Sequence, residues 1–158
     1  MNVLIICVGN RFRNDDAAGH AVAELLEAKS LPHTTIVEEN GEGAVLMDRW
    51  KDAQAVIIVD AVSSGGMPGS VHRFDVHETN VPSKFFHYST HAFSVAEAVE
   101  LARALNHLPP RMLLYGVEGK SFEAGLALSP EVRESIPTIV TSIIGDLAAW
   151  TPERSPHA

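Results

Sequence analysis

The feature that most constrains the fold is the alternation of short, fully apolar, β-branched runs with segments of helical periodicity. Residues 3–8 and 55–59 are runs without a single polar position. A strand that is apolar on both faces has to be covered on both sides, which is typical of parallel sheets. Helical spacing of apolar residues follows, first from about Asp15 to just before Pro32. The alternation predicts an α/β domain whose mostly parallel sheet is covered by helices on both faces.

Further runs and turn residues predict the remaining elements. Strands are expected at residues 34–37, 71–76 and 112–115. A short helix is expected at 44–50. Two longer helices are expected from the capping box Ser94-Val95-Ala96-Glu97 to Leu105 and from Ser129-Pro130 to Leu147. Pro137 is expected to kink or restart the last helix. The length of 158 residues suits one domain over residues 1–150, followed by a mobile C-terminal tail at 151–158.

Charge and cysteine content exclude several classes of protein. The 12 basic residues are outnumbered by 20 acidic ones and form no cluster, so nucleic acid is not an expected partner. No apolar stretch approaches the roughly 20 residues of a membrane span, and the apolar start lacks the basic region of a signal peptide. Cys7 is the only cysteine, which excludes a disulfide framework. We therefore expect a soluble, cytoplasmic protein in which Cys7 is a small core residue.

Polar residues at the ends of the apolar runs are the candidates for a site. Ligands of open α/β sheets bind beyond the carboxyl ends of the strands. Asp15 and Asp16 follow the first run, Asp60 follows the run at 55–59, and His91 precedes the capping box. Two carboxylates and one imidazole leave coordination positions open and suit a divalent cation such as nickel, zinc or manganese.

Structural interpretations of the same residues stay open at this point. Asp15 and Asp16 could cap the helix that follows or favour its positive end, and Asp60 could form a turn at a strand end. His91 could be an ordinary loop histidine, and His20 could support the site from outside. Motifs of other enzymes are missing: the chain has no Gly-x-Ser-x-Gly, no His-Glu-x-x-His, no Walker motif and no complete dinucleotide fingerprint.

Four segments stand out together: residues 9–19 (GNRFRNDDAAG), 59–62 (VDAV), 89–91 (STH) and 125–132 (GLALSPEV). They resemble the hydrogenase maturation endopeptidases, which process the large subunits of nickel-iron hydrogenases. Residues 9–19 (GNRFRNDDAAG) are similar to that family's opening Gly-Asn-x4-Asp-Asp/Glu-Gly-x-Gly signature. The similarity continues in register at residues 59–62, 89–91 and 125–132. Ala17 stands where the family commonly has glycine, and Asp16 is the shorter acid where some members carry glutamate. Asn40-Gly41 stands where many have Asp-Gly, with Glu39 and Glu42 as neighbouring carboxylates that could substitute.

The resemblance implies a three-layer sandwich around a five-stranded sheet, and a metal site formed by Asp16, Asp60 and His91 as ligands and catalytic residues. It implies removal of a C-terminal extension from the large-subunit precursor once nickel has been inserted. The nickel would come from the substrate, and another divalent cation could occupy the site in vitro. In this interpretation a carboxylate released from the metal, or Asp15, carries the proton for the leaving amine.

The principal alternative is a non-catalytic, nickel- or subunit-binding chaperone of hydrogenase assembly on the same fold. The presence of all three ligand residues argues against it, because a chaperone would tolerate their loss. A small-molecule hydrolase or a nucleotide-binding protein is a weaker alternative, since the motifs of those proteins are missing.

Overall fold

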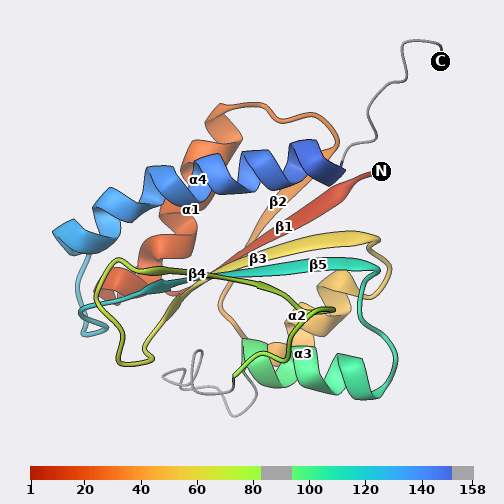
Figure 1. Cartoon of the computed structure of the whole chain (residues 1–158). Helices are drawn as coiled ribbons and strands as arrows, with labels where there is room; N and C mark the ends of the chain where they lie inside the picture. The colour runs from red at the N-terminus through yellow and green to blue at the C-terminus, as the bar shows by residue number, and fades with distance from the viewer. Residues whose placement is uncertain (83–93, 151–158) are drawn as a thin grey trace.

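The computed structural model describes residues 1–82 and 94–150 of the chain. Within these residues five strands form one sheet in the order β2-β1-β3-β5-β4, and four α-helices cover it, as Figure 1 shows. The strands β1, β2, β3 and β5 are parallel, and β4 runs antiparallel to β5. The strands are β1 (Val3–Val8), β2 (Thr34–Glu39), β3 (Ala55–Val62), β4 (Val71–Asp75) and β5 (Arg111–Glu118). The predicted single-domain α/β sandwich is confirmed.

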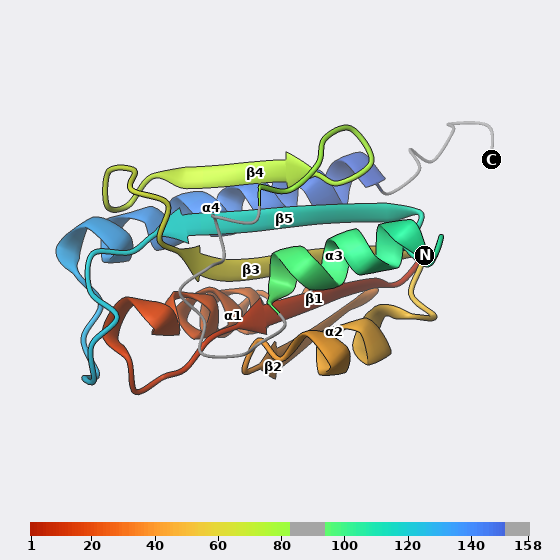
Figure 2. The same cartoon turned by 90° about the horizontal axis from the view of Figure 1, so that it is seen from below.

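The two faces of the sheet carry separate hydrophobic cores because side chains alternate along each strand. Ile5 and Cys7 pack against the face covered by α1 (Ala18–Ala28) and α4 (Pro130–Trp150). Ile6 and Val8 pack against the face covered by α2 (Gly43–Trp50) and α3 (Val95–Ala104). Figure 2 shows α2 and α3 together on their side of the sheet. Cys7 is fully buried, as expected of a core residue.

Two differences between the predicted and the observed elements bear on the candidate site. The strand expected to end before Asp60 continues to Val62, because β5 offers backbone partners as far as the pair Val62–Glu118. Asp60 therefore lies inside β3, opposite Gly116. Before the first long helix, a 3-10 helix, η1 (Asn14–Ala17), holds both acidic residues of the motif.

Pro137 does not restart the last helix, since α4 runs without interruption from Pro130 to Trp150. Pro137 is exposed, so water can solvate the backbone carbonyl that loses its helical donor. The expected C-terminal tail at 151–158 lies outside the described residues. Among the described helices, none combines the length and the apolar character that a membrane span requires.

Gly19 explains how close α1 comes to the sheet. A Cβ atom at this position would lie 2.4 Å from the Val8 carbonyl oxygen, far inside van der Waals contact. Only glycine allows the first turn of α1 to pack on the end of β1. This close packing, together with the contact between η1 and β3, brings the acidic residues of η1 to the carboxyl edge of the sheet.

Candidate active site

Asp16 is held at the carboxyl edge of the sheet by the loop that follows β1. The Asn10 amide donates a hydrogen bond to Asp16 Oδ2 at 3.0 Å, and the Asp16 amide donates to the Arg13 carbonyl at 3.0 Å. Gly9 has φ of +149°, and a Cβ atom there would lie 1.9 Å from the Asp16 carbonyl oxygen. The Gly-Asn pair is therefore needed for the loop to fold back on Asp16.

Asp60 reaches the same place from β3. Its side chain is buried, with 7% of the residue exposed. Burial raises the pKa of Asp60 well above its ordinary value, the negative charge of Asp16 raises it further, and the hydrogen bond from the Ala61 backbone opposes both. Asp60 Oδ1 accepts no hydrogen bond from the described residues. The structure thus brings together two of the three predicted site residues, and their charges repel.

His91, the third predicted residue, lies outside the described residues, so its role as a ligand stays a prediction. The described part of the chain has no group of three His, Cys, Asp or Glu side chains suited to a metal ion. The capping box that follows is confirmed, since Ser94 Oγ accepts from the Glu97 amide at 3.4 Å. Helix α3 leads into the amino end of β5, so its N-terminus faces the carboxyl edge of the sheet.

Asp15 is buried next to Asp16 but binds a different part of the molecule. Its carboxylate accepts hydrogen bonds from the amides of Lys120 (2.7 Å), Ser121 (3.1 Å) and Ser129 (2.7 Å), and from Ser129 Oγ (2.9 Å). Asp15 therefore anchors the β5–α4 loop and does not cap the helix that follows it. The expectation that Asp15 carries a proton in catalysis does not fit this geometry, because both oxygens already hold the loop.

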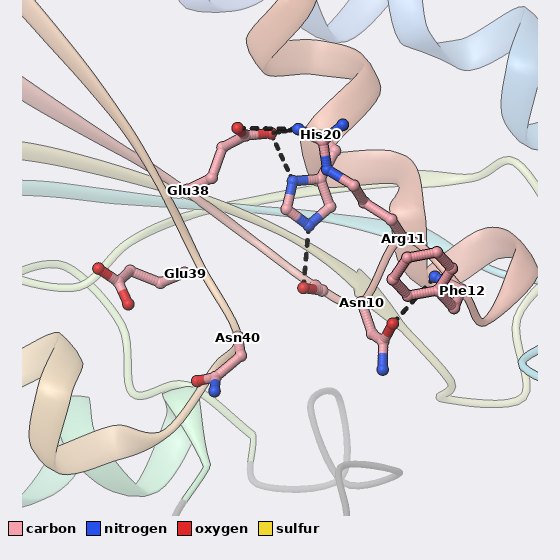
Figure 3. A pocket seen from close by; sticks show the side chains of 8 residues that line it. Asn10, Arg11, Phe12, His20, Glu38, Glu39 and Asn40 are labelled. Atoms are coloured by element: carbon pink, nitrogen blue, oxygen red, sulfur yellow. Dashed lines mark hydrogen bonds and ion pairs between the residues drawn. The ribbon is translucent and has the colours of Figure 1, made fainter.

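A pocket of about 380 Å³ adjoins this edge, shown in Figure 3. Residues of the β1–η1 loop, of α1 and of the end of β2 line it: Gly9, Asn10, Arg11, Phe12, His20, Glu38, Glu39 and Asn40. His20 Nδ1 contacts Glu38 Oε1 at 2.5 Å, and Arg11 binds both oxygens of Glu38 at 2.8 and 2.9 Å. Burial acts to raise the pKa of Glu38, but His20 and Arg11 outweigh it and lower the pKa.

Comparison with known proteins decides the family. The family model for hydrogenase maturation proteases matches residues 20–146. The chain belongs to the hydrogenase maturation protease family. It is 26% identical to the Hydrogenase 2 maturation protease of Escherichia coli K12, over 99% of this chain and 97% of that protein. The Rhodobacter capsulatus hydrogenase expression/formation protein HupD is 27% identical, over 94% of this chain and 72% of that protein.

Solved structures agree with this assignment. The hydrogenase maturating endopeptidase HybD from E. coli has a TM-score of 0.78 at 25% identity, and the comparison covers 94% of this chain and 93% of that one. The solution structure of an endopeptidase from E. coli has a TM-score of 0.79 at 28% identity, with coverage of 93% and 92%. This hydrogenase maturation protease is accordingly a peptidase with the fold of those enzymes.

The two carboxylates beside Asn40 have structural partners in this maturation protease. Glu39 forms an ion pair with Arg49 at 2.6 Å. Glu42 caps α2, accepting hydrogen bonds from the amides of Ala44 (3.1 Å) and Val45 (3.2 Å). The structure therefore does not support the expectation that either replaces a third carboxylate of the site.

A buried carboxylate that the sequence analysis missed is Glu118, at the end of β5, with 1% of the residue exposed. It accepts hydrogen bonds from the Ser64 amide (3.2 Å), from Ser64 Oγ and from His72 Nε2 (3.0 Å). The three residues come from β5, the β3–β4 loop and β4, so no local pattern connects them. Glu118 fixes the β3–β4 loop, as Asp15 fixes the β5–α4 loop.

Proposed function

We propose that this protease removes a C-terminal extension from the large-subunit precursor of a nickel-iron hydrogenase after nickel has been inserted. Membership of the maturation protease family supports a hydrogenase precursor as the substrate. The observation that carries the proposal is the pair Asp16 and Asp60. These two carboxylates are buried at the carboxyl edge of the sheet, and the charge of Asp16 disfavours the ionised form of Asp60. Such a pair is typical of a site that receives a cation.

The residues fit the nickel that the substrate carries. Asp60 Oδ1 lacks a hydrogen-bond donor among the described residues, and a divalent cation would offset both its burial and the repulsion by Asp16. His91, three residues before the N-cap of α3, would add the imidazole nitrogen that nickel favours. Another divalent cation would occupy the same three residues in vitro.

The bound metal would supply Lewis acidity to the attacking water or to the scissile carbonyl. In this mechanism the chain's own groups hold the metal centre of the precursor and thereby place the cleavage point against the site. Asp60 is a better proton carrier than Asp15 for the leaving amine, because the oxygens of Asp15 are committed to the β5–α4 loop. We place this processing step in the cytoplasm, which suits the single free Cys7.

The test is cleavage of a purified, nickel-loaded precursor, followed by mass spectrometry of its C-terminus. The wild type should shorten the precursor, and Asp16→Asn, Asp60→Asn and His91→Gln should each abolish the shortening while far-UV circular dichroism stays unchanged. Glu78→Gln, an exposed carboxylate beyond the end of β4, is the matched control and should cleave normally. Binding of the precursor by the wild type without any loss of mass would instead favour the chaperone alternative.

A further inference from the structure

His20 lies between two groups that only accept hydrogen bonds. Its Nε2 atom donates to the Gly9 carbonyl oxygen at 2.9 Å, and its Nδ1 atom faces Glu38 Oε1 at 2.5 Å. Glu38 and the Gly9 carbonyl therefore hold the ring from two sides, through its two nitrogen atoms. The His20 side chain is 12% exposed, which limits competition from water. These two contacts orient the ring, and Figure 3 shows His20 with one ring nitrogen directed toward Glu38.

The peptide group that His20 binds is the one that binds Asp16. The carbonyl of Gly9 and the amide of Asn10 belong to a single planar peptide unit. The carbonyl accepts from His20 at 2.9 Å, and the amide donates to Asp16 Oδ2 at 3.0 Å. A continuous hydrogen-bonded chain therefore runs from Glu38 through His20 and this peptide to the carboxylate of Asp16.

This peptide needs such support because it lies outside the regular strand. β1 ends at Val8, and Gly9, with φ of +149°, has no Cβ atom to restrict the backbone at this point. The hydrogen bond that His20 donates at the carbonyl end also polarises the amide toward Asp16, since hydrogen bonds in series strengthen one another.

We propose that His20, oriented by Glu38, is a positioning residue for the Asp16 carboxylate. It acts through the Gly9–Asn10 peptide and sets the direction in which Asp16 presents its oxygens to the cation of the substrate. The expected effect on catalysis rests on the proposed function. The hydrogen-bonded link from His20 to Asp16 is a property of the chain itself. Outer partners that orient a ligand commonly contribute about 10- to 100-fold in metal affinity or activity.

The test compares His20→Ala and His20→Gln with His77→Ala. His77 is a matched control because its Nε2 atom also binds a backbone carbonyl, that of Pro109 at 2.7 Å, at the opposite edge of the sheet. His20→Ala should lower kcat for precursor cleavage at least about 10-fold with little change in KM. His20→Gln, which can still donate to the Gly9 carbonyl, should recover part of that loss. His77→Ala should keep the wild-type kcat.

A second measurement judges the link without any substrate. In ¹H–¹⁵N NMR spectra of the free protein, His20→Ala should move the Asn10 amide proton upfield and accelerate its exchange, and His77→Ala should leave it in place. An unchanged Asn10 amide in His20→Ala would overturn the proposal, as would a kcat equal to that of the wild type. If the Asn10 amide responds but the wild type cleaves no precursor, the proposed function is the part that fails, and the positioning of Asp16 stands.

Discussion

Asp15 and Asp16 are neighbours in the sequence and both are buried, yet their carboxylates have different surroundings. Asp15 accepts four hydrogen bonds from one loop, which hold it in place. Asp16 is aligned by the Asn10 amide and lies within electrostatic reach of Asp60. Consecutive residues of a 3-10 helix point about 120° apart, so one can anchor a loop while the other faces the site.

At the residue scale, the repulsion between Asp16 and Asp60 predicts a conflict between stability and function. In chelator-treated protein, Asp60→Asn should raise the melting temperature at pH 7, and each 1 kcal/mol gained would correspond to roughly 2–4 °C. The pKa of Asp60 is higher in the folded than in the unfolded chain, so the folded state loses stability as pH rises above the ordinary value.

The gain should therefore be present at neutral pH and vanish below about pH 4, where Asp60 is protonated in both states. Calorimetry of both proteins from pH 3.5 to 8 measures it. A melting temperature of Asp60→Asn below that of the wild type at pH 7 would contradict the electrostatic interpretation.

Cys7 gives a second prediction at this scale. Burial raises the pKa of the Cys7 thiol to about 12, with smaller contributions from the charges of Glu38 and Glu27, so the reactive thiolate is scarce at pH 8. The folded protein should resist a thiol reagent such as DTNB at pH 8 and react fully in 6 M guanidinium chloride. Cys7→Ala should cost roughly 1–2 kcal/mol as a small cavity and leave cleavage unchanged. Rapid labelling of the folded protein would count against the core role.

At the scale of elements, the loops around the site are tied to each other as well as to the sheet. The Gly125 amide donates to the Phe12 carbonyl at 2.9 Å, and the Asn14 amide donates to the Gly125 carbonyl at 3.0 Å. Gly125 fits here without a side chain, since a Cβ atom would lie 2.2 Å from Asn14 Oδ1. Together with the contacts of Asp15, these bonds join η1, the β5–α4 loop and the start of α4 into one unit.

This unit should depend on Asp15. Asp15→Ala leaves the part-buried amides of the β5–α4 loop without an acceptor, and we expect it to lower the free energy of unfolding by about 2–4 kcal/mol. Denaturant unfolding followed by circular dichroism measures this loss, with Glu123→Ala, an exposed acid of the same loop, as the control. Hydrogen exchange should accelerate first at Lys120, Ser121 and Ser129. If Asp15→Ala has the same free energy of unfolding as Glu123→Ala, the β5–α4 loop does not depend on Asp15 for its stability.

At the scale of the whole molecule, the hydrophobic cores and the candidate active site lie in different parts of the fold. The two apolar cores lie on the faces of the sheet, and the site lies at its carboxyl edge, where loops supply polar groups and carry little of the packing energy. The pocket at that edge is lined mainly by polar and charged side chains. The charged and polar groups of such a pocket fix which ligand it accepts.

Selectivity for the loaded precursor follows from this arrangement. Nickel bound in the precursor should be the main anchor, so the nickel-loaded form should be cleaved at least about 100-fold faster than the nickel-free form or an isolated peptide spanning the cleavage point. Mass spectrometry of matched substrates under identical conditions measures the ratio. Equal cleavage of all three would mean that the polypeptide alone is recognised and that the site acts as an ordinary metalloprotease centre.

The apolar runs by themselves determined the class of fold, because only a sheet covered on both faces can bury runs such as residues 3–8. Local signals were equally sufficient for the capping box at Ser94 and for the burial of Cys7. The positions of Asp16 and Asp60 could also be predicted, since parallel strands deliver their carboxyl ends to one edge. The role of His91 as a metal ligand was predicted from the sequence alone, and it stays a prediction because His91 lies outside the described residues.

Tertiary structure decided what the acidic residues do. Nothing in the residues around Asp15 distinguishes it from Asp16, because its partners stand 105 to 114 positions away in the β5–α4 loop. The extension of β3 past Asp60 depends on backbone partners in β5, and backbone pairing is indifferent to side-chain polarity. The chain from Glu38 through His20 to Asp16 joins β2, α1 and η1, so it exists only once these elements are packed together.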